Sequence, residues 1–333
     1  MAVTLKDIAK KVNLSTSTVS IVLNDRPCRI PEETKELIRK TAREMNYIPD
    51  MIARSLVGSK GSVLGIVVPN ERNPFYAGIV YAIAVVAETN GWQVITLESY
   101  EDPKRETEEL KMLIALRVSA IIMIPCVVDG EDEFAAIDSL ITSSGIPFIY
   151  GNAPLDIRLN HPNVSIDHSL CTKLAMEHLL KKGHRKISVL AGNYFCNRMY
   201  RKGIDEALRE YGTGEEEIRI YSFDHEPIMA SDSVDQILKS DHSAVICMSD
   251  EYIFVLYAAI QKQDRKIPED IAVVGMDNVY FARSLSPKLT TIDKNSDAYG
   301  RSIASFLFDE YQDNEDQNFC RIIRPELIIG DST

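Results

Sequence analysis

The chain has 333 residues, of which 45% are hydrophobic and 26% are charged, and its formal net charge is −12 at pH 7. This is the composition of an ordinary globular protein, and the length predicts two or three domains. No apolar run reaches the roughly 18 residues that a membrane span needs. Charged residues lie within the first 11 positions with no apolar core behind them, so we expect no secretory signal, a cytoplasmic protein and no membrane partner.

The charge is unevenly distributed along the chain. Residues 1–60 hold 11 basic and 7 acidic residues, a local charge of +4, whereas residues 61–333 hold 26 basic and 42 acidic residues, a charge of −16. A basic first segment on an acidic remainder is expected when only that segment meets phosphates. A chance excess of +4 over 60 residues is the alternative, so charge alone leaves DNA binding open.

Residues 1–48 are predicted to form three short helices. Apolar residues recur at helical spacing in the first of them: Leu5, Ile8, Ala9 and Val12. Thr4 and Asp7 resemble a capping box, and Asn13 suits a left-handed turn after this helix. Ser15 is placed to cap a second helix, whose expected inward residues are Val19, Val22 and Leu23.

A third helix is expected after Pro31, with one face made of Thr34, Leu37, Ile38, Thr41, Ala42 and Met45. Two short helices joined by a tight turn, with a third that completes the core, form a helix-turn-helix unit. The second helix begins with short hydroxyl side chains, where a recognition helix contacts base edges. A plain three-helix packing domain with a solvated Ser/Thr face is the alternative, and periodicity alone favours neither interpretation.

Two stretches of this region resemble one known protein family. The run TLKDIAKKVNLSTSTVSIVLN (4–24), followed by PEETKELIRKTAREMNYIPDMIARSL (31–56), resembles the first domain of the lactose-repressor (LacI/GalR) family. The resemblance implies a transcription regulator that binds a double-stranded DNA operator. By position it implies that Thr16, Ser17 and Ile21 contact bases. We expect the following residues to contribute further DNA contacts: Ser15, Thr18, Arg26 and Arg54.

Ile21 is a departure, because many members of the family have Arg at this position. Ile cannot make the bidentate contact to guanine, but it can pack on a thymine methyl group. The departure therefore affects which operator is bound, and leaves DNA binding itself as expected.

Residues 49–61 are predicted to be a hinge helix and linker. The segment DMIARSLV (50–57) is bounded by Pro49 and Gly58 and is too short for a helix that is stable alone in water. We expect it to order on DNA beside its twin in a dimer. The resemblance implies that Leu56 wedges between base pairs in the minor groove. A plain linker is the alternative.

Residues 62–333 alternate short apolar runs with helical patterns. We expect buried parallel strands at 62–68, 92–97, 120–125 and 147–151, with helices near 75–89, 104–117 and 131–143. We expect a second series of strands to begin near 163–166 and to continue at 186–192, 218–223, 244–248 and 271–276. The fold class is therefore a small all-α helix-turn-helix domain followed by an α/β body of two doubly wound lobes.

Motifs for catalysis or cofactor binding are missing from this body. It has no G-x-G-x-x-G after a strand, no P-loop, no G-x-S-x-G and no H-E-x-x-H. His178 and His184 are six residues apart, which fits no common zinc spacing, and the six cysteines are scattered as small core residues. We expect no enzyme activity, no catalytic residues, no cofactor and no metal.

Two α/β lobes in succession suggest a ligand clamp of the periplasmic-binding type. The family resemblance extends over most of the body, through NPFYAGI (73–79), EHLLKKGHRKISVLAG (177–192) and IPEDIAVVGMDN (267–278). It implies a ligand-binding and dimerisation core with interleaved lobes. The first lobe is expected at about 62–160 plus 292–322, and the second at about 161–291 plus 323–333.

The cleft is expected at the carboxyl ends of the strands. The resemblance implies effector contacts at Phe75, Tyr76, Asp167, Asp250 and Asp277. Aromatic rings would stack on a sugar or base, and carboxylates would accept hydrogen bonds. For each Asp, a helix or loop cap is the alternative.

One position departs from the family in the cleft. Relatives usually have Arg three residues before the glycine that stands here as Gly203, whereas this chain has Tyr200. Arg198 and Arg201 flank this position and either can substitute; we take Arg198 as the expected effector contact. The effector class stays open, with a carbohydrate or derivative favoured.

We expect a homodimer, because a single domain with few contacts binds DNA weakly. One alternative is a regulator controlled by a protein partner. Two others are a solute-binding receptor, which would lack the first domain, and a dinucleotide enzyme, which would need a phosphate-binding glycine loop.

Overall fold

The computed structural model describes residues 3–24, 27–47, 63–126, 131–155, 157, 159–192, 197–214, 217–223, 230–311 and 319–333. The chain divides into two units, Met1–Ser62 and Val63–Thr333, which we call the head and the body. The predicted hinge helix at 50–57 lies outside the described residues.

The head contains the three expected helices, α1 (Leu5–Val12), α2 (Thr16–Leu23) and α3 (Glu32–Glu44). Their shared core consists of Ile8, Ala9, Val19, Val22, Ile38 and Ala42. Of the residues predicted on one face of α3, Leu37 is 49% exposed. The periodic face of α3 is wider than the surface that α1 and α2 can cover, so Leu37 remains at its edge.

Both ends of α1 form as the sequence predicts. The Asp7 carboxylate accepts a hydrogen bond from the Thr4 amide at 2.9 Å and from the Thr4 hydroxyl at 2.7 Å. These bonds lower the pKa of Asp7. Asn13 ends the helix with φ at 55°, in the left-handed region that asparagine tolerates. Local hydrogen bonding therefore fixes the turn that leads into α2.

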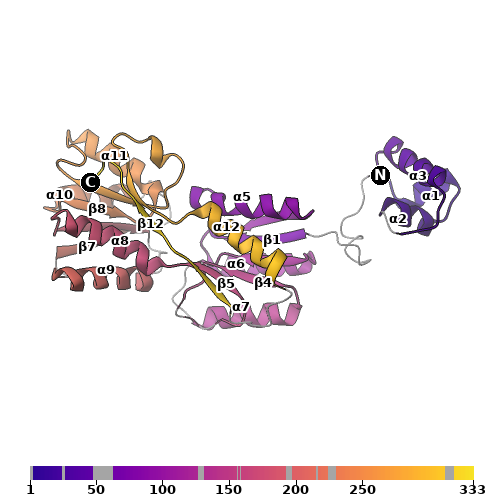
Figure 1. Ribbon diagram of the computed structural model, residues 1–333, viewed down its shortest axis with the longest axis horizontal. Helices are drawn as coiled ribbons and strands as arrows, with labels where there is room; N and C mark the ends of the chain where they lie inside the picture. Colours follow the sequence, from indigo (N-terminus) through magenta and orange to yellow (C-terminus); the bar gives the residue numbers. More distant parts are fainter. Residues whose placement is uncertain are drawn as a thin grey trace. The chain divides into compact units, whose positions relative to one another are not determined.

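The first sheet of the body has six parallel strands in the order β11-β5-β4-β3-β1-β2. The strands are β1 (Val63–Val68), β2 (Gln93–Glu98), β3 (Ala120–Met123), β4 (Phe148–Gly151), β5 (Asn163–Ile166) and β11 (Cys320–Ile323). Helices α5 (Pro74–Thr89) and α12 (Ser296–Ser305) pack on one face, and α6 (Pro103–Ala115) and α7 (Glu131–Ser144) on the other (Figure 1). Alternate residues of β1 face the two layers, Ile66 and Val68 towards α5 and Val67 towards α6.

The second sheet has the order β12-β10-β9-β8-β6-β7, with only β12 antiparallel. Its strands are β6 (Ile187–Gly192), β7 (Ile218–Phe223), β8 (Ala244–Cys247), β9 (Ala272–Met276), β10 (Thr290–Asp293) and β12 (Glu326–Ile328). The connecting helices are α8 (His168–Lys181), α9 (Asn197–Tyr211), α10 (Ala230–Lys239) and α11 (Ile253–Lys262). The two doubly wound lobes predicted from the sequence are confirmed.

The prediction that the second series of strands begins at 163–166 was wrong. Strand β5 belongs to the first sheet, where Asn163 pairs with Tyr150 of β4 and Val164 with Arg321 of β11. The first lobe therefore extends past residue 160, and the chain crosses to the second lobe between β5 and α8. A short strand before a helix gives no sequence signal for the sheet that it joins, because both lobes repeat the same pattern.

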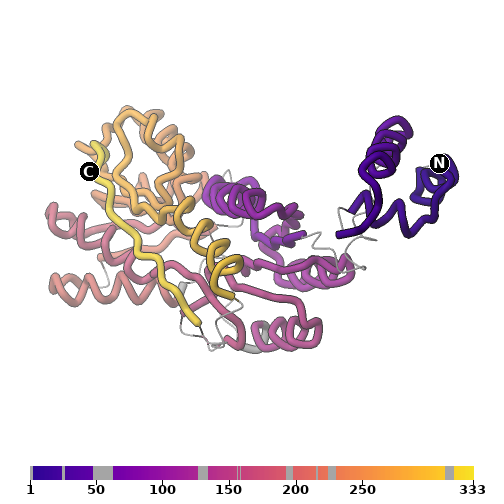
Figure 2. Tube along the Cα trace, turned by 45° about the vertical axis from the view of Figure 1, so that its right-hand side comes forward, coloured from indigo at the N-terminus to yellow at the C-terminus, as the bar shows by residue number. Residues whose placement is uncertain are grey.

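The chain crosses between the lobes twice more. It returns from β10 to α12, which packs on α5, and it leaves the first lobe again between β11 and β12. Figure 2 shows the last segment, drawn in yellow, running from one lobe to the other. Residues near these crossovers lie between the lobes, where the cleft is expected.

Candidate functional site

The first turn of α2 combines helix capping with an exposed polar surface. The Ser15 hydroxyl accepts a hydrogen bond from the Thr18 amide at 3.0 Å and lies 2.7 Å from the Thr18 hydroxyl. These two side chains therefore complete the helix end. Thr16 and Ser17 are exposed and Ile21 is half-buried, so this part of the surface offers hydroxyl groups and one aliphatic edge to a partner.

Three further residues that we expect to contact DNA cannot be placed. Arg26, Arg54 and Leu56 lie outside the described residues. The roles of Arg54 and Leu56 stay predictions that rest on the family resemblance, and that of Arg26 stays a prediction that rests on its positive charge beside the expected recognition helix.

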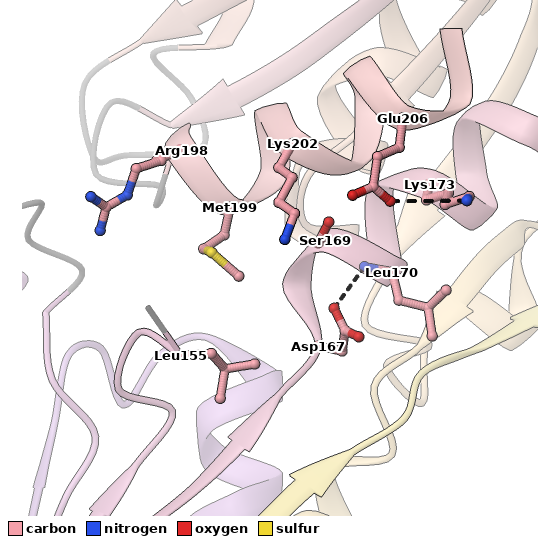
Figure 3. Close-up of a pocket in the computed structure, with 9 residues that line it drawn as sticks. All are labelled: Leu155, Asp167, Ser169, Leu170, Lys173, Arg198, Met199, Lys202 and Glu206. Carbon is pink, nitrogen blue, oxygen red and sulfur yellow. Dashed lines mark hydrogen bonds and ion pairs between the residues drawn. The ribbon is translucent and has the colours of Figure 1, made fainter. Parts of the chain in front are cut away.

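The body contains a cavity of about 470 Å³ at the start of α8 and α9 (Figure 3). It brings together two predicted effector contacts, Asp167 and Arg198. The other lining residues are Leu155, Ser169, Leu170, Lys173, Met199, Lys202 and Glu206. Leu155 comes from the first lobe and the rest from the second, so the cavity lies between the lobes.

A glycine allows α8 and α9 to approach closely beside this cavity. A Cβ atom at Gly203 would lie 1.9 Å from the backbone oxygen of Ser169 and 2.3 Å from the Thr172 hydroxyl. Only glycine fits such a crossing without moving a helix. The close approach sets Lys202 and Ser169 on the same wall of the cavity, as Figure 3 shows.

Some charged side chains of the cavity have partners within the described part of the chain, and one does not. Asp167 caps α8 by accepting a hydrogen bond from the Leu170 amide at 2.9 Å, and Lys173 lies 3.9 Å from a carboxylate oxygen of Glu206. The Lys202 ammonium points into the cavity and forms no ion pair within the described part of the chain. The cavity therefore offers a positive group to a ligand.

A second group of predicted effector residues is buried beside the cavity. Asp277 follows β9 and forms an ion pair with Lys294, with 2.8 Å between Asp277 Oδ1 and Lys294 Nζ. The Ser249 hydroxyl donates to Asp277 Oδ2 at 3.0 Å. Lys294 Nζ lies 5.0 Å from the centre of the Phe75 ring, and it donates to the Tyr200 hydroxyl at 3.4 Å. We call Phe75, Tyr200, Asp277 and Lys294 the Lys294 cluster.

A neutral histidine closes one side of the Lys294 cluster. The His168 ring lies 4.9 Å from the Tyr200 ring, and His168 Nε2 lies 2.7 Å from the Asn152 side-chain oxygen. Burial, with the nearby positive charge of Lys294, lowers the pKa of His168 to about 3. Because Asn152 belongs to the first lobe and His168 to the second, this hydrogen bond joins the two lobes.

Asp250 has internal partners. Its side chain is fully buried, and its carboxylate accepts hydrogen bonds from the Val279 amide at 3.0 Å and the Thr291 hydroxyl at 3.1 Å. A Cβ atom at Gly275 would lie 2.2 Å from Asp250 Oδ1, so glycine leaves room for this carboxylate. The loop-cap alternative fits Asp250 better than an effector contact.

The structure thus divides five of the six predicted effector residues into three groups. Asp167 and Arg198 line the cavity, Phe75 and Asp277 belong to the Lys294 cluster, and Asp250 holds the loop behind it. Tyr76 is half-buried next to Phe75, with 5.4 Å between the ring centres.

Sequence reasoning missed Lys294, Lys202 and His168. Lys294 had one usable signal, because it directly follows β10 and therefore stands at the carboxyl end of a parallel strand.

Within the described ranges, no helix is long and apolar enough to cross a membrane. No group of three or more His, Cys, Asp or Glu side chains there could hold a metal ion.

Comparison with known proteins gives matches over almost the whole chain. Residues 4–50 match the model of bacterial regulatory proteins of the lacI family, and residues 61–326 match that of periplasmic binding proteins and the sugar-binding domain of the LacI family. The chain is 28% identical over 334 residues to the HTH-type transcriptional repressor PurR of Pasteurella multocida, covering 99% of this chain and 98% of that protein.

Solved structures share the fold. The lac repressor dimer bound to operator and the anti-inducer ONPF matches with a TM-score of 0.86 and 22% identity, covering 100% of this chain and 99% of that one. The complex of the transcriptional regulator CelR with cellobiose matches with a TM-score of 0.70 and 23% identity, covering 99% and 100%.

Proposed function

Because this chain belongs to the lacI family of bacterial regulatory proteins, we propose that it binds a pseudo-palindromic DNA operator as a homodimer, with an affinity that a small molecule in the interlobe cleft adjusts. The observation that carries this proposal is the exposed first turn of α2, with Thr16 and Ser17 on the surface of a folded helix-turn-helix. Hydroxyl side chains at this place contact base edges in the major groove. Ile21 would add contact to a thymine methyl group.

Exposed aromatic side chains of the body support dimerisation. Tyr280 is 79% exposed, and its ring lies 5.3 Å from that of Phe281, which in turn lies 4.8 Å from Phe254. Exposed aromatic groups of this kind mark interaction surfaces. The operator-bound lac repressor is a dimer, and a second copy of this chain is the partner that we propose.

The cavity at α8 and α9 is the proposed effector site. It offers the Lys202 ammonium and Arg198 beside the apolar side chains of Leu155 and Met199. A carbohydrate derivative with a carboxylate or phosphate group fits this lining, because the acid would pair with Lys202 and the ring face would pack on Leu155. Asp167, which lines the same cavity, would add a hydrogen bond.

Coupling between the two sites is proposed to be a two-state process. A ligand between the lobes favours one relative position of the lobes, and this changes the spacing of the two hinge segments in the dimer. The size of the change in DNA affinity is then set by how much more tightly the ligand binds one state than the other.

A genomic selection followed by footprinting of the full chain tests DNA binding. The expected result is protection of two half-sites related by a two-fold axis. The Ser17→Ala variant should need about tenfold more protein for the same protection, while Thr34→Ala on α3 should protect as the wild type does. A single unrepeated half-site, or no preference over bulk competitor DNA at low salt, would refute the proposal.

A thermal-shift screen of metabolites against the full chain tests the effector site, because a bound ligand raises the Tm. The expected hit raises the Tm of the wild type but not that of Lys202→Ala. If no metabolite raises it, yet a protein partner shifts DNA affinity, control by a partner protein replaces the proposed effector.

A further inference from the structure

Lys294 stands at the point where the chain returns from the second lobe to the first. It follows β10 and precedes α12, and its side chain is only 4% exposed. A buried ammonium group needs a partner of opposite charge, and Asp277 provides it. The ion pair with Asp277 therefore balances the charge of Lys294.

The groups around the Lys294 ammonium resemble those of a binding site for organic cations. A carboxylate lies at 2.8 Å, and aromatic rings lie at 5.0 Å (Phe75) and 5.8 Å (Tyr200) from the nitrogen. Aromatic faces attract ammonium groups, and the attraction is stronger where water is excluded. The pKa of Lys294 is raised by Asp277, so the side chain keeps its charge despite burial.

Two observations distinguish this cluster from an ordinary structural ion pair. It is built from both lobes, since Phe75 belongs to the first and Asp277 and Tyr200 to the second. In addition, Asp277 has φ at 112°, outside the regions that side chains other than glycine prefer. Strain of this kind persists where the surroundings hold a residue in place for function.

We propose that Lys294 is a built-in occupant of the cleft, whose ammonium group fills a cation site formed by Asp277, Phe75 and Tyr200. External ligands are thereby excluded from Asp277 and confined to the neighbouring cavity of Lys202 and Arg198. Lys294 thus determines ligand specificity: without its side chain, the cation site accepts a primary alkylammonium ion.

The test replaces the side chain by a free ion. Truncation in Lys294→Ala removes three carbons and the ammonium group, which together correspond to n-propylammonium. With millimolar n-propylammonium chloride, the Tm of Lys294→Ala should rise by roughly 3 °C or more above an equal concentration of NaCl. The wild type should show no difference between the two salts. Neutral propan-1-ol should not replace the ion.

A second variant shows where the ion binds. The double variant Lys294→Ala/Asp277→Ala lacks the carboxylate, so the selective rise in Tm should vanish. Equal shifts in the wild type, or a shift that persists in the double variant, would overturn the proposal, and so would the lack of any selective shift in Lys294→Ala.

If the Lys294→Ala chain does not fold, the reciprocal experiment tests the same site. Asp277→Ala leaves the ammonium of Lys294 without its partner and removes one carboxylate, which corresponds to formate. Formate should then raise the Tm of Asp277→Ala more than chloride does, and equal effects of the two anions would count against the cation site.

A DNA-binding measurement relates this site to regulation, and this step alone rests on the proposed function. Operator affinity of Lys294→Ala should change with n-propylammonium, whereas that of the wild type should not. A selective Tm shift without any DNA binding would refute the proposed function and leave the cation site standing. Normal operator binding without a selective Tm shift would refute the cation site and leave the proposed function standing.

Discussion

The exposed first turn of α2 with Thr16 and Ser17, which we call the α2 surface, differs from the Lys294 cluster in exposure and in charge. Thr16 and Ser17 are exposed, uncharged and held by local helix geometry. The cluster is buried and charged, and it depends on residues that are far apart in the sequence, such as Phe75 and Lys294. An exposed hydroxyl can be removed at little cost in stability, whereas a buried charge without its partner is costly.

This contrast gives the two regions different mutational signatures. Substitutions on the α2 surface should lower DNA affinity and leave unfolding unchanged. Substitutions among the buried acids of the body should lower stability first. The single tryptophan, Trp92, lies in the body against Phe308, so its fluorescence reports the unfolding of that unit.

The largest stability effect is expected for Asp250→Ala. The variant leaves the Val279 amide and the Thr291 hydroxyl without their acceptor in a buried site. We expect the free energy of unfolding of the body to fall by about 3 kcal/mol, measured by urea titration of Trp92 fluorescence. Asp297→Ala removes an exposed carboxylate and should change it by less than about 0.5 kcal/mol. Equal effects of the two variants would remove the contrast between buried and exposed acids.

The next effect concerns pH. Burial raises the pKa of Glu106 from 4.5 to about 7, and its carboxylate accepts a hydrogen bond from the Cys126 amide. The pKa of this carboxyl group is higher in the folded chain than in the unfolded chain. Its contribution to stability is therefore fully present below about pH 4.5, and it is lost as pH rises through 7. We expect the body to lose about 2 kcal/mol of stability between pH 5 and pH 8 through this group.

Glu106→Gln tests this source of the pH dependence. The amide oxygen can still accept the Cys126 bond, and it does not titrate. The variant should be close to the wild type at pH 5 and more stable at pH 8. The exposed Asp7 in the head has the opposite behaviour: its pKa is lowered, so its contribution is lost only as pH falls through that lowered value. A wild-type body that is equally stable at pH 5 and pH 8 would contradict the burial of a titrating Glu106.

A smaller effect is expected from single substitutions on the α2 surface. Thr16→Ala and Ser17→Ala should each reduce operator affinity about tenfold, corresponding to one lost hydrogen bond. Fluorescence anisotropy with the selected operator measures this loss. The urea midpoint of the body should not change. A fall in that midpoint would show that the two regions are not separate in the way their exposure indicates.

The same contrast explains what the sequence could predict. The capping box of Thr4 and Asp7, the turn at Asn13 and the cap at Ser15 each depend on residues within three or four positions, and all of them form. The α/β alternation likewise identified β1 to β9 from their own apolar runs, whereas β10, β11 and β12 were not predicted as strands. Local patterns thus suffice where the contacts themselves are local.

The cleft could be predicted only in part. The family resemblance pointed to Asp277 and Asp250, but not to their partners. Asp277 pairs with Lys294 across 17 positions, and Lys294 reaches Phe75 across more than 200. Sheet membership has the same difficulty, because β5 resembles any short strand and only its pairing with β4 and β11 assigns it.

The smallest effect, at Ser15, separates helix capping from base contact within the head. Ser15→Ala removes the acceptor for the Thr18 amide, so α2 should lose about 1 kcal/mol of stability, seen as faster hydrogen exchange of its amides. Ser15→Asn keeps a side chain that caps well, and exchange should stay close to that of the wild type. If Ser15 serves only the cap, Ser15→Asn binds the operator as the wild type does, and Ser15→Ala weakens binding less than Ser17→Ala. If both Ser15 variants bind tenfold more weakly while α2 in Ser15→Asn stays protected, then the hydroxyl contacts DNA directly, and the division of α2 into capping and contacting residues would have to be redrawn.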